Sequence, residues 1–554
     1  MNSMKTSILL FLLFCLVASL QLRADAAEGS ADSANRAESF DVVVFGATSG
    51  GVSAAVQVAR EGKSVVLLEP GKHVGGMTAS GLGWIDIKGT SSIGGVAHEF
   101  IARVIKQYNA DGIDTRKFGN SGWVVEPHVA ENVYNAMLRE AKVPVEFGYK
   151  LASAAKNGVR ITAVTSEAGK TVEGKMFIDA SYEGDLMARA KVSYIIGREA
   201  KAKYNEPLAG IRPESEGGLD RKLKIDPFIK PGDPASGLIP LVQDGEVGKP
   251  GDGSDAIQDY NYRLCMTRDP ANRLPIAPPA DYDPKQYELV GRFFAAHAAL
   301  GTSFSLAEAK GKTHVLKMDR IPRGKTDVNN GARVSTDYAG YSQSYPEASY
   351  KQREEIARAH ENYIRGFLHF LATDPRVPEN VRTEMKTWGL AKDEFTDNGG
   401  WPYQLYVREA RRLVGEYVMT QHDAERKTKF DDSVGMASYS LDSHICRRIV
   451  DRGIVIQEGS FYQRIPGPYP ISYRALTPRS AECENLLVPA CCSASHVAYA
   501  SVRMEPVFMI LGQSSASAAV LAINQNTSVQ KIDVKKLQER LARDGQVLDL
   551  QKKR

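Results

Sequence analysis

Cysteine is scarce in this 554-residue chain, which holds six. Cys15 lies in the first apolar run, and the others are spaced irregularly at Cys265, Cys446, Cys483, Cys491 and Cys492. Without Cys15 five remain, and an odd number at irregular spacing does not describe a disulfide framework, although one bridge stays open. No C-x-x-C pair occurs, which argues against the redox-active disulfide of a dithiol reductase. The adjacent Cys491 and Cys492 are expected to be small packing residues.

An excess of charge of one sign is also missing. Lys and Arg total 70 and Asp and Glu total 66, for a net charge of +4. This balance gives no argument for nucleic acid or an anionic membrane as a partner. With 43% hydrophobic residues and 48 glycines, the chain suits a large core and many tight loops over a ligand.

Long apolar runs are the third absence. The apolar stretch at residues 8–20 is too short for a confident membrane span. It follows Lys5 and precedes Ala24-Asp25-Ala26, so residues 1–26 read as a secretory signal peptide, and 27–39 as a polar linker. No later segment is expected to be long enough for a span. Without a twin arginine, we expect export of the unfolded chain, and a secreted or periplasmic protein.

The motifs that indicate a function are concentrated in residues 40–76. In order, this stretch has an apolar run at 42–45, glycines at Gly46, Gly50 and Gly51, a helical segment at 52–60, and a second apolar run at 65–68 that stops at Glu69. Strand, glycine turn, helix, strand and acid form the βαβ unit that binds an ADP moiety.

Each part of this unit has a physical task. Gly46 lets the chain turn off the strand, and Gly50 and Gly51 give the backbone room to approach a pyrophosphate. The helix N-terminus offers free N–H groups and a partial positive charge to the phosphates. Glu69 is placed to accept hydrogen bonds from a ribose diol. Thr48 stands where a strict G-x-G-x-x-G has glycine. The alternative interpretation, a structural βαβ crossover that binds no ligand, therefore stays open.

The chain then passes through a second glycine turn. Residues 68–84 read LEPGKHVGGMTASGLGW. This segment resembles the FAD-dependent oxidoreductases of the glutathione-reductase-like superfamily, and within it a secreted bacterial family whose members also go by the name xanthan lyase. The resemblance covers about residues 41–523 and implies FAD. We expect non-covalent binding, since no residue sits in an identified flavinylation motif.

Two later segments strengthen the resemblance. Residues 176–186, MFIDASYEGDL, are similar to the superfamily's second flavin-side motif, and Asp179 is also suited to capping a helix start. The helix expected from Glu505 to Leu521 points its N-terminus at the flavin in the resembled family. The resemblance implies the cofactor-binding residues Gly46, Thr48, Ser49, Gly50, Gly51, Glu69, Pro70, Gly75, Gly76, Met77, Ala180, Ser181, Gly184, Asp185 and Gly512.

The fold class expected is α/β, with a Rossmann-like FAD-binding domain of the glutathione-reductase-like type and a large inserted substrate or cap domain. The predicted divisions are signal peptide 1–26, linker 27–39, FAD-binding domain 40–200, inserted region 201–430, closing part of the FAD-binding domain 431–525, and charged tail 526–554. A hairpin over 158–178 is expected to cover the sheet. No metal site is predicted.

Several local predictions concern the later chain. Helices are expected at 354–372 and 401–421, with 406–412 as a solvated, salt-bridged face. Lys325 to Asn330 is read as a polar turn, either facing a polyhydroxylated substrate or purely structural. Residues 496–503 are read as a loop.

Removing a hydride from a substrate requires a base for the departing proton. The candidates are His444 and His496, with Arg503 orienting an anionic or carbonyl substrate or holding the flavin; Asp442 either orients His444 or caps a helix. His73 is expected to lie against the cofactor. The sequence therefore predicts an FAD-dependent dehydrogenase or oxidase of a small polar or carbohydrate-derived substrate, with its electron acceptor open. The alternative is a polysaccharide-binding or lyase protein without redox chemistry.

Overall fold

The computed structural model describes residues 38–213 and 219–550. The predicted signal peptide at 1–26 lies outside the described residues, as do residues 27–37 of the linker. Glu38 and Ser39, assigned to the linker from sequence, already belong to strand β1.

Within the described residues, seven strands form the main sheet, in the order β3-β2-β1-β6-β5-β4, with β22 paired to β6. Their bounds are β1 Glu38–Phe45, β2 Val65–Glu69, β3 Val145–Phe147, β4 Leu151–Asn157, β5 Arg160–Ser166, β6 Thr171–Asp179 and β22 Leu486–Leu487. Strands β3, β2, β1, β6 and β22 run parallel. Phe45 pairs with both Leu68 and Asp179, so β1, β2 and β6 end together at the sheet edge where such folds bind ligands.

The two faces of this sheet bury different partners, because side chains alternate along a strand. Val42 and Val44 pack with the helices, and Val43 and Phe45 pack with the β4–β5 side. The helices are α2 Ser49–Arg60, α3 Gly95–Ala110, α4 Pro127–Glu140 and α13 Glu505–Gln525. Strands β5 and β6 form the expected hairpin. Strand β6 also pairs with β1 in the main sheet, and side chains of the hairpin pack on the second face of that sheet.

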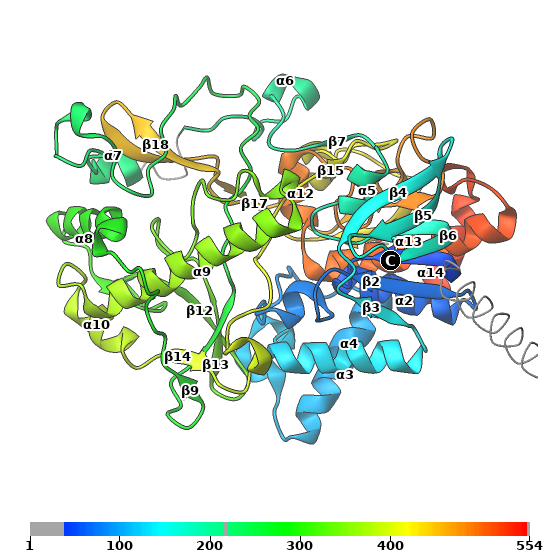
Figure 1. The fold of residues 1–554 in the computed structure, drawn as a ribbon, viewed down its shortest axis with the longest axis horizontal. Helices are drawn as coiled ribbons and strands as arrows, with labels where there is room; N and C mark the ends of the chain where they lie inside the picture. The colour runs from blue at the N-terminus through cyan, green and yellow to red at the C-terminus, as the bar shows by residue number, and fades with distance from the viewer. Residues whose placement is uncertain (1–37, 214–218, 551–554) are drawn as a thin grey trace, which may run out of the picture.

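A second, antiparallel sheet has the order β12-β13-β8-β14-β9. Its strands are β8 Leu264–Thr267, β9 Arg273–Leu274, β12 Lys317–Ile321, β13 Lys325–Asn329 and β14 Gly389–Ala391, accompanied by α8 Glu288–Ala299, α9 Tyr350–Thr373 and α10 Glu379–Met385. Figure 1 shows this sheet beside the main one, with the long helix α9 extending between the two parts. Helix α9 confirms the helix predicted at 354–372.

Short elements complete the fold. The two-stranded pairs are β7 Tyr194–Ile195 with β15 Arg412–Leu413, β10 Phe304–Ser305 with β11 Thr313–His314, β16 Ser433–Ala437 with β21 Tyr469–Ser472, β17 Leu441–Ser443 with β20 Phe461–Gln463, and β18 Arg447–Asp451 with β19 Ile454–Glu458. The short helices are α5 Asp185–Arg189, α6 Lys201–Tyr204, α7 Leu219–Leu223, α11 Gln421–Ala424, α12 His496–Val502 and α14 Val534–Arg543.

The helix predicted at 401–421 is wrong. This segment is extended and irregular up to strand β15, and α11 begins only at Gln421. The charged residues read as a solvated face are buried: Arg408 is 1% exposed and Glu409 and Arg412 are 0% exposed. Arg408 and Arg412 form ion pairs with Asp337 and Glu199, residues far away in the chain that a local pattern does not reveal, and Glu409 pairs with Arg412 within the segment.

The loop predicted at 496–503 is also wrong. Residues 496–502 form helix α12, and the hydroxyl of Ser495 accepts a hydrogen bond from the Ala498 amide at 3.1 Å. Serine at this position is a standard helix N-cap, so a start signal was present in the sequence.

Helix α13 corrects the expectation that no later segment is long enough for a membrane span. Residues 505–525 are long and apolar enough by length and composition, but 94% of the most apolar window is buried inside the protein. The apolar character of α13 is explained by its place between α2, α3 and β16. The five cysteines of the described residues are all buried and free, so the bridge left open from sequence does not form.

Helix α13 crosses α2 at a backbone contact between two glycines. A Cβ atom at Gly512 would lie 2.1 Å from the carbonyl oxygen of Gly50, and a Cβ at Gly50 would lie 2.8 Å from the carbonyl oxygen of Phe508. The obstructing atoms are backbone, so they cannot move aside cheaply. These two glycines therefore set the separation of the helices.

We predict that Gly512→Ala lowers the free energy of unfolding by about 1–3 kcal/mol, the usual cost of overpacking a core. Urea denaturation followed by circular dichroism measures it. Asn524→Ala, an exposed position on the same helix, is the control and should change stability by less than about 0.5 kcal/mol. Equal stability of Gly512→Ala and the control would show that the helices separate without cost.

Candidate active site

The glycine turn after β1 is shaped by contacts with the end of β6. Gly46 has φ of 92°, and a Cβ there would lie 2.7 Å from the amide nitrogen of Ser181. Thr48 caps α2: its hydroxyl accepts from the Gly51 amide at 3.2 Å and donates to the Ala180 carbonyl at 2.7 Å. Threonine thus replaces the motif's glycine and ties the helix start to β6. The first amides of α2 have no intrahelical acceptor and suit an anion.

Glu69 ends β2 beside this turn. Its carboxylate accepts the amide hydrogens of Ala47 and Gly71, each at 2.7 Å. Burial raises the pKa of Glu69 to about 7, against the effect of the two amide donors. The main chain thus fixes the carboxylate, while its remaining lone pairs stay available for a ligand's hydroxyl groups.

The second glycine turn is fixed by two tyrosines. A Cβ at Gly75 would lie 2.4 Å from the ring of Tyr134, and one at Gly76 would lie 2.2 Å from the hydroxyl of Tyr182. The Tyr182 hydroxyl accepts from the Met77 amide at 3.0 Å and donates to the Glu505 carboxylate at 2.7 Å. The turn therefore requires glycine for packing as well as for its positive φ.

The segment after β6 holds two buried carboxylates with different tasks. Asp179 accepts from the Ser181 amide at 3.1 Å and from the Met187 amide at 2.8 Å, which confirms its capping role. Asp185 accepts from Arg353 of α9 at 2.6 Å and from Arg411 at 2.9 Å. Although burial alone would raise it, these guanidinium groups hold the pKa of Asp185 below its ordinary value.

These segments enclose a cavity of about 430 Å³, within the range of about 300–1,000 Å³ usual for ligand pockets. Of the predicted cofactor residues, Gly46, Thr48, Glu69, Pro70, Gly76, Ser181 and Asp185 line it. Ser49, Gly50, Gly51, Gly75, Met77, Ala180, Gly184 and Gly512 lie behind this wall, in the turns and helices that support it. Helix α9 supplies the facing wall through Tyr350, Arg353 and Glu354, which the sequence reading missed.

His73 lies in the same wall. Its ring stacks on Tyr403 with centroids 3.3 Å apart, and its nitrogens approach Glu131 at 3.0 Å and Asp397 at 3.2 Å. These carboxylates raise the pKa of His73 although burial alone would lower it.

The two candidate bases lie in different surroundings. His496 is 1% exposed, and both ring nitrogens contact buried groups: Nδ1 lies 2.8 Å from Glu409, and Nε2 lies 3.1 Å from the Ser443 hydroxyl. Burial lowers its pKa well below the ordinary value. A neutral ring donating to Glu409 and accepting from Ser443 satisfies all three groups, so His496 has a structural task.

His444 is only partly buried, and its Nδ1 lies 3.3 Å from Asp337 and 3.2 Å from the amide of Asn330. The orienting carboxylate is therefore Asp337. It is not Asp442, the residue that the sequence suggested for this role. Burial and the nearby Arg408 lower the pKa of His444. Hydrogen bonding at Nδ1 leaves Nε2 as the nitrogen free to act as a base.

Arg503 ends α12, next to the start of α13. It is 5% exposed and donates to the Tyr406 hydroxyl at 3.0 Å and to the Asp442 carbonyl at 2.9 Å. Through Asp442 it is tied to strand β17, which leads directly into His444. The structure thus brings Arg503 and the segment carrying His444 together.

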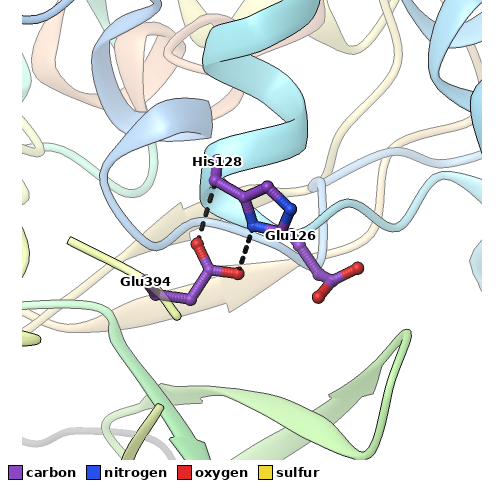
Figure 2. Close-up of side chains that lie close together, drawn as sticks. All are labelled: Glu126, His128 and Glu394. Carbon is purple, nitrogen blue, oxygen red and sulfur yellow. Dashed lines mark hydrogen bonds and ion pairs between the residues drawn. The ribbon is translucent and has the colours of Figure 1, made fainter. Parts of the chain in front are cut away.

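The polar turn read at Lys325 to Asn330 is mainly strand β13, which lies between β12 and β8 in the second sheet. Lys325 is buried, and its ammonium lies 2.7 Å from Glu126 and 2.6 Å from Glu394. Figure 2 shows these carboxylates with His128, whose Nδ1 lies 2.7 Å from Glu394. They are metal-ligand types, but Lys325 already supplies the cation. The cluster joins α4 to the second sheet, and the reading of Lys325 as facing substrate is wrong.

Comparisons with known proteins assign the chain to a family. The profile of the FAD dependent oxidoreductase family matches residues 41–541. No curated protein matches the chain.

Among solved structures, a flavoprotein/dehydrogenase from Cytophaga hutchinsonii is 17% identical over 28% of this chain and 42% of its own, with a TM-score of 0.21. A flavocytochrome c3 fumarate reductase is 15% identical over 32% and 46%, with a TM-score of 0.20. A flavin monooxygenase from Stenotrophomonas maltophilia is 19% identical over 26% and 38%, with a TM-score of 0.17.

The chain thus spans less than half the length of these solved structures. The family profile, in contrast, runs from the first described strand to the last helix and includes both glycine turns. The chain belongs to the FAD-dependent oxidoreductase family.

Proposed function

We propose that the chain binds FAD non-covalently in this cavity and oxidises a small polar substrate, carbohydrate-derived molecules included. The observation that carries the proposal is the cavity itself, where a helix N-terminus and a main-chain-oriented carboxylate meet at the ends of parallel strands. We further propose the glutathione-reductase-like type of domain, with residues 201–430 as the substrate or cap region.

The residues present fit FAD at both ends of its ADP moiety. The first amides of α2, with Gly46, would hold the pyrophosphate, because they offer donors and a partial positive charge. Glu69 would accept from the ribose hydroxyls. When bound, FAD accepts a hydride from a substrate carbon.

The chain's own part in the reaction is to orient the substrate and take its proton. Asp337 holds His444 through Nδ1, so Nε2 is the atom that would accept the proton of the substrate hydroxyl. His496 links β17 to the 401–411 segment, because its ring contacts Ser443 of the strand and Glu409 of the segment. An electron acceptor of unassigned identity would complete the reaction.

The alternative, a polysaccharide-binding or lyase protein, needs no dinucleotide, and family membership does not favour it. We retain secretion or a periplasmic location as part of the proposal, on the pattern of residues 1–26. Nucleic acid has no place in it, because the net charge is +4 in 554 residues.

The purified protein should be yellow, and trichloroacetic acid should release the colour into the supernatant. This outcome is expected because no residue of the sequence sits in an identified flavinylation motif. Absorbance of pellet and supernatant measures it. Colour that stays in the pellet contradicts non-covalent binding, and a colourless protein that cannot be reconstituted contradicts FAD binding itself.

Glu69→Ala should weaken FAD binding by about 1.5–3 kcal/mol, the range for hydrogen bonds to a charged group. Fluorescence titration of the apoprotein gives the dissociation constant. Glu69→Gln should lie between, since it keeps one acceptor oxygen, and the exposed Glu167→Ala is the control. An unchanged constant in Glu69→Ala would place the ribose elsewhere.

His444→Ala should slow reduction of the bound flavin by about 10²–10⁴-fold, as loss of a general base does. His444 can accept a proton only when its ring is neutral, and its pKa is lowered. In wild type, the rate of flavin reduction should therefore fall with acidity only below about pH 6.5. Asp337 raises the pKa of His444, so Asp337→Asn should move that fall to still lower pH.

Stopped-flow reduction across pH measures both effects, with flavin content fixed by absorbance. The exposed His98→Ala is the control. Reduction of His444→Ala within a few-fold of wild type would remove it as the base.

A further inference from the structure

Three buried arginines surround the ring of Tyr406. The guanidinium carbons of Arg408, Arg263 and Arg503 lie 4.9, 5.6 and 6.0 Å from its centroid. A tyrosine ring attracts cations, but the attraction is too weak to neutralise buried charges. Each arginine therefore needs an anionic partner as well.

This arginine cluster is connected through the chain to residues that line the cavity. Three residues of the cavity wall are each followed in the chain by a residue of the cluster or by one that touches it. The pairs are Ser80 with Gly81, Tyr262 with Arg263, and Leu405 with Tyr406. A Cβ at Gly81 would lie 1.8 Å from the carbonyl oxygen of Arg263, so the glycine turn and the cluster are in direct backbone contact.

Two of the three arginines have carboxylate partners. Arg263 donates to Asp327 at 2.8 Å, and Arg408 donates to Asp337 at 3.0 Å. Arg503 has none: within residues 38–213 and 219–550, no carboxylate forms an ion pair with it. Its two bonds go to neutral oxygens, and its Nε is buried with no partner.

A buried charge without a carboxylate in ion-pair contact is costly, so this position suits an anion that arrives with a ligand. Arg263 adds a second buried nitrogen, Nη1, with no partner. A guanidinium group binds carboxylates in particular, because its parallel donors match the two oxygens.

Two carboxylate groups, those of Asp86 and Asp442, lie near Arg503. Asp86 and Asp442 are half-buried, and Asp86 lies 3.4 Å from the Tyr439 hydroxyl. Their charges, with Tyr406, hold the pKa of Arg503 above its ordinary value although burial alone would lower it. Acceptors of this kind bind hydroxyl groups and repel a second carboxylate.

We propose that Arg503, assisted by Tyr406 and Arg263, binds the carboxylate of a small hydroxylated acid, and that Asp86 and Asp442 receive its hydroxyl groups. This inference rests on the proposed function, since the acid is the substrate to be oxidised. Sugar acids and shorter hydroxy acids belong to this class.

The test is equilibrium binding to the yellow holoprotein. Glycolate, lactate and D-glucuronate are titrated against their neutral amides, with flavin difference spectra and calorimetry as readouts. We expect at least one acid to bind about 10- to 100-fold more tightly than its amide. Arg503→Gln should abolish this preference, Arg503→Lys should retain part of it, and the exposed Arg139→Gln should leave it unchanged.

Two results overturn the inference. One is equal binding of every acid and its amide, or no binding of either, in wild type. The other is an Arg503→Gln protein that keeps its preference for the acid but has a shifted flavin midpoint potential, which would make the cofactor the partner of Arg503. If Arg503→Gln does not load FAD, the preference for acid over amide is compared between wild type, Arg503→Lys and Tyr406→Phe.

The two proposals fail separately. Wild-type protein that carries no flavin and cannot be reconstituted contradicts the proposed function. Protein that carries flavin but shows no preference for acids contradicts only the assignment of Arg503.

Discussion

Three distant parts of the chain meet at the hydroxyl group of Tyr182. It accepts from the Met77 amide and donates to Glu505, and so joins the second glycine turn, the segment after β6 and the first turn of α13. All three groups are buried, and burial raises the pKa of Glu505 to about 7. Removing one partner leaves the others unpaired, at a cost of about 1–3 kcal/mol each. The shape of the cavity depends on this junction, because each joined segment supplies or supports a wall.

The parts of the fold that sequence predicted well are those whose signals are local. The apolar run at 42–45, the glycine turn and the helix that follows are neighbours in the chain, and each forms as expected. The hairpin of β5 and β6 and the helix α9 have the same origin. Helix α13 was predicted from its proline and apolar composition, and only its length was misjudged.

The failures share a different cause, which is the burial of charge. Charged residues are usually exposed, so Arg408, Glu409 and Arg412 were read as a solvated helix face. In the structure all three are buried, and the two arginines are paired across the chain; Glu199, for example, is the partner of Arg412 from 213 residues away. The same holds at His444, whose carboxylate partner is Asp337, 107 residues distant, and not its neighbour Asp442. Pairs of this kind are set by tertiary structure and leave no periodic signal.

The facing walls of the cavity have a thermodynamic consequence. One wall comes from the main sheet and the other from α9, which starts near residue 350 and belongs to the second part of the fold. A ligand held between them stabilises the contact between both parts at once, and at a concentration 100-fold above its dissociation constant adds about 2.7 kcal/mol to folding. Cofactor loading and the cooperativity of unfolding are therefore linked, so that the two parts of the loaded protein should melt as a single unit.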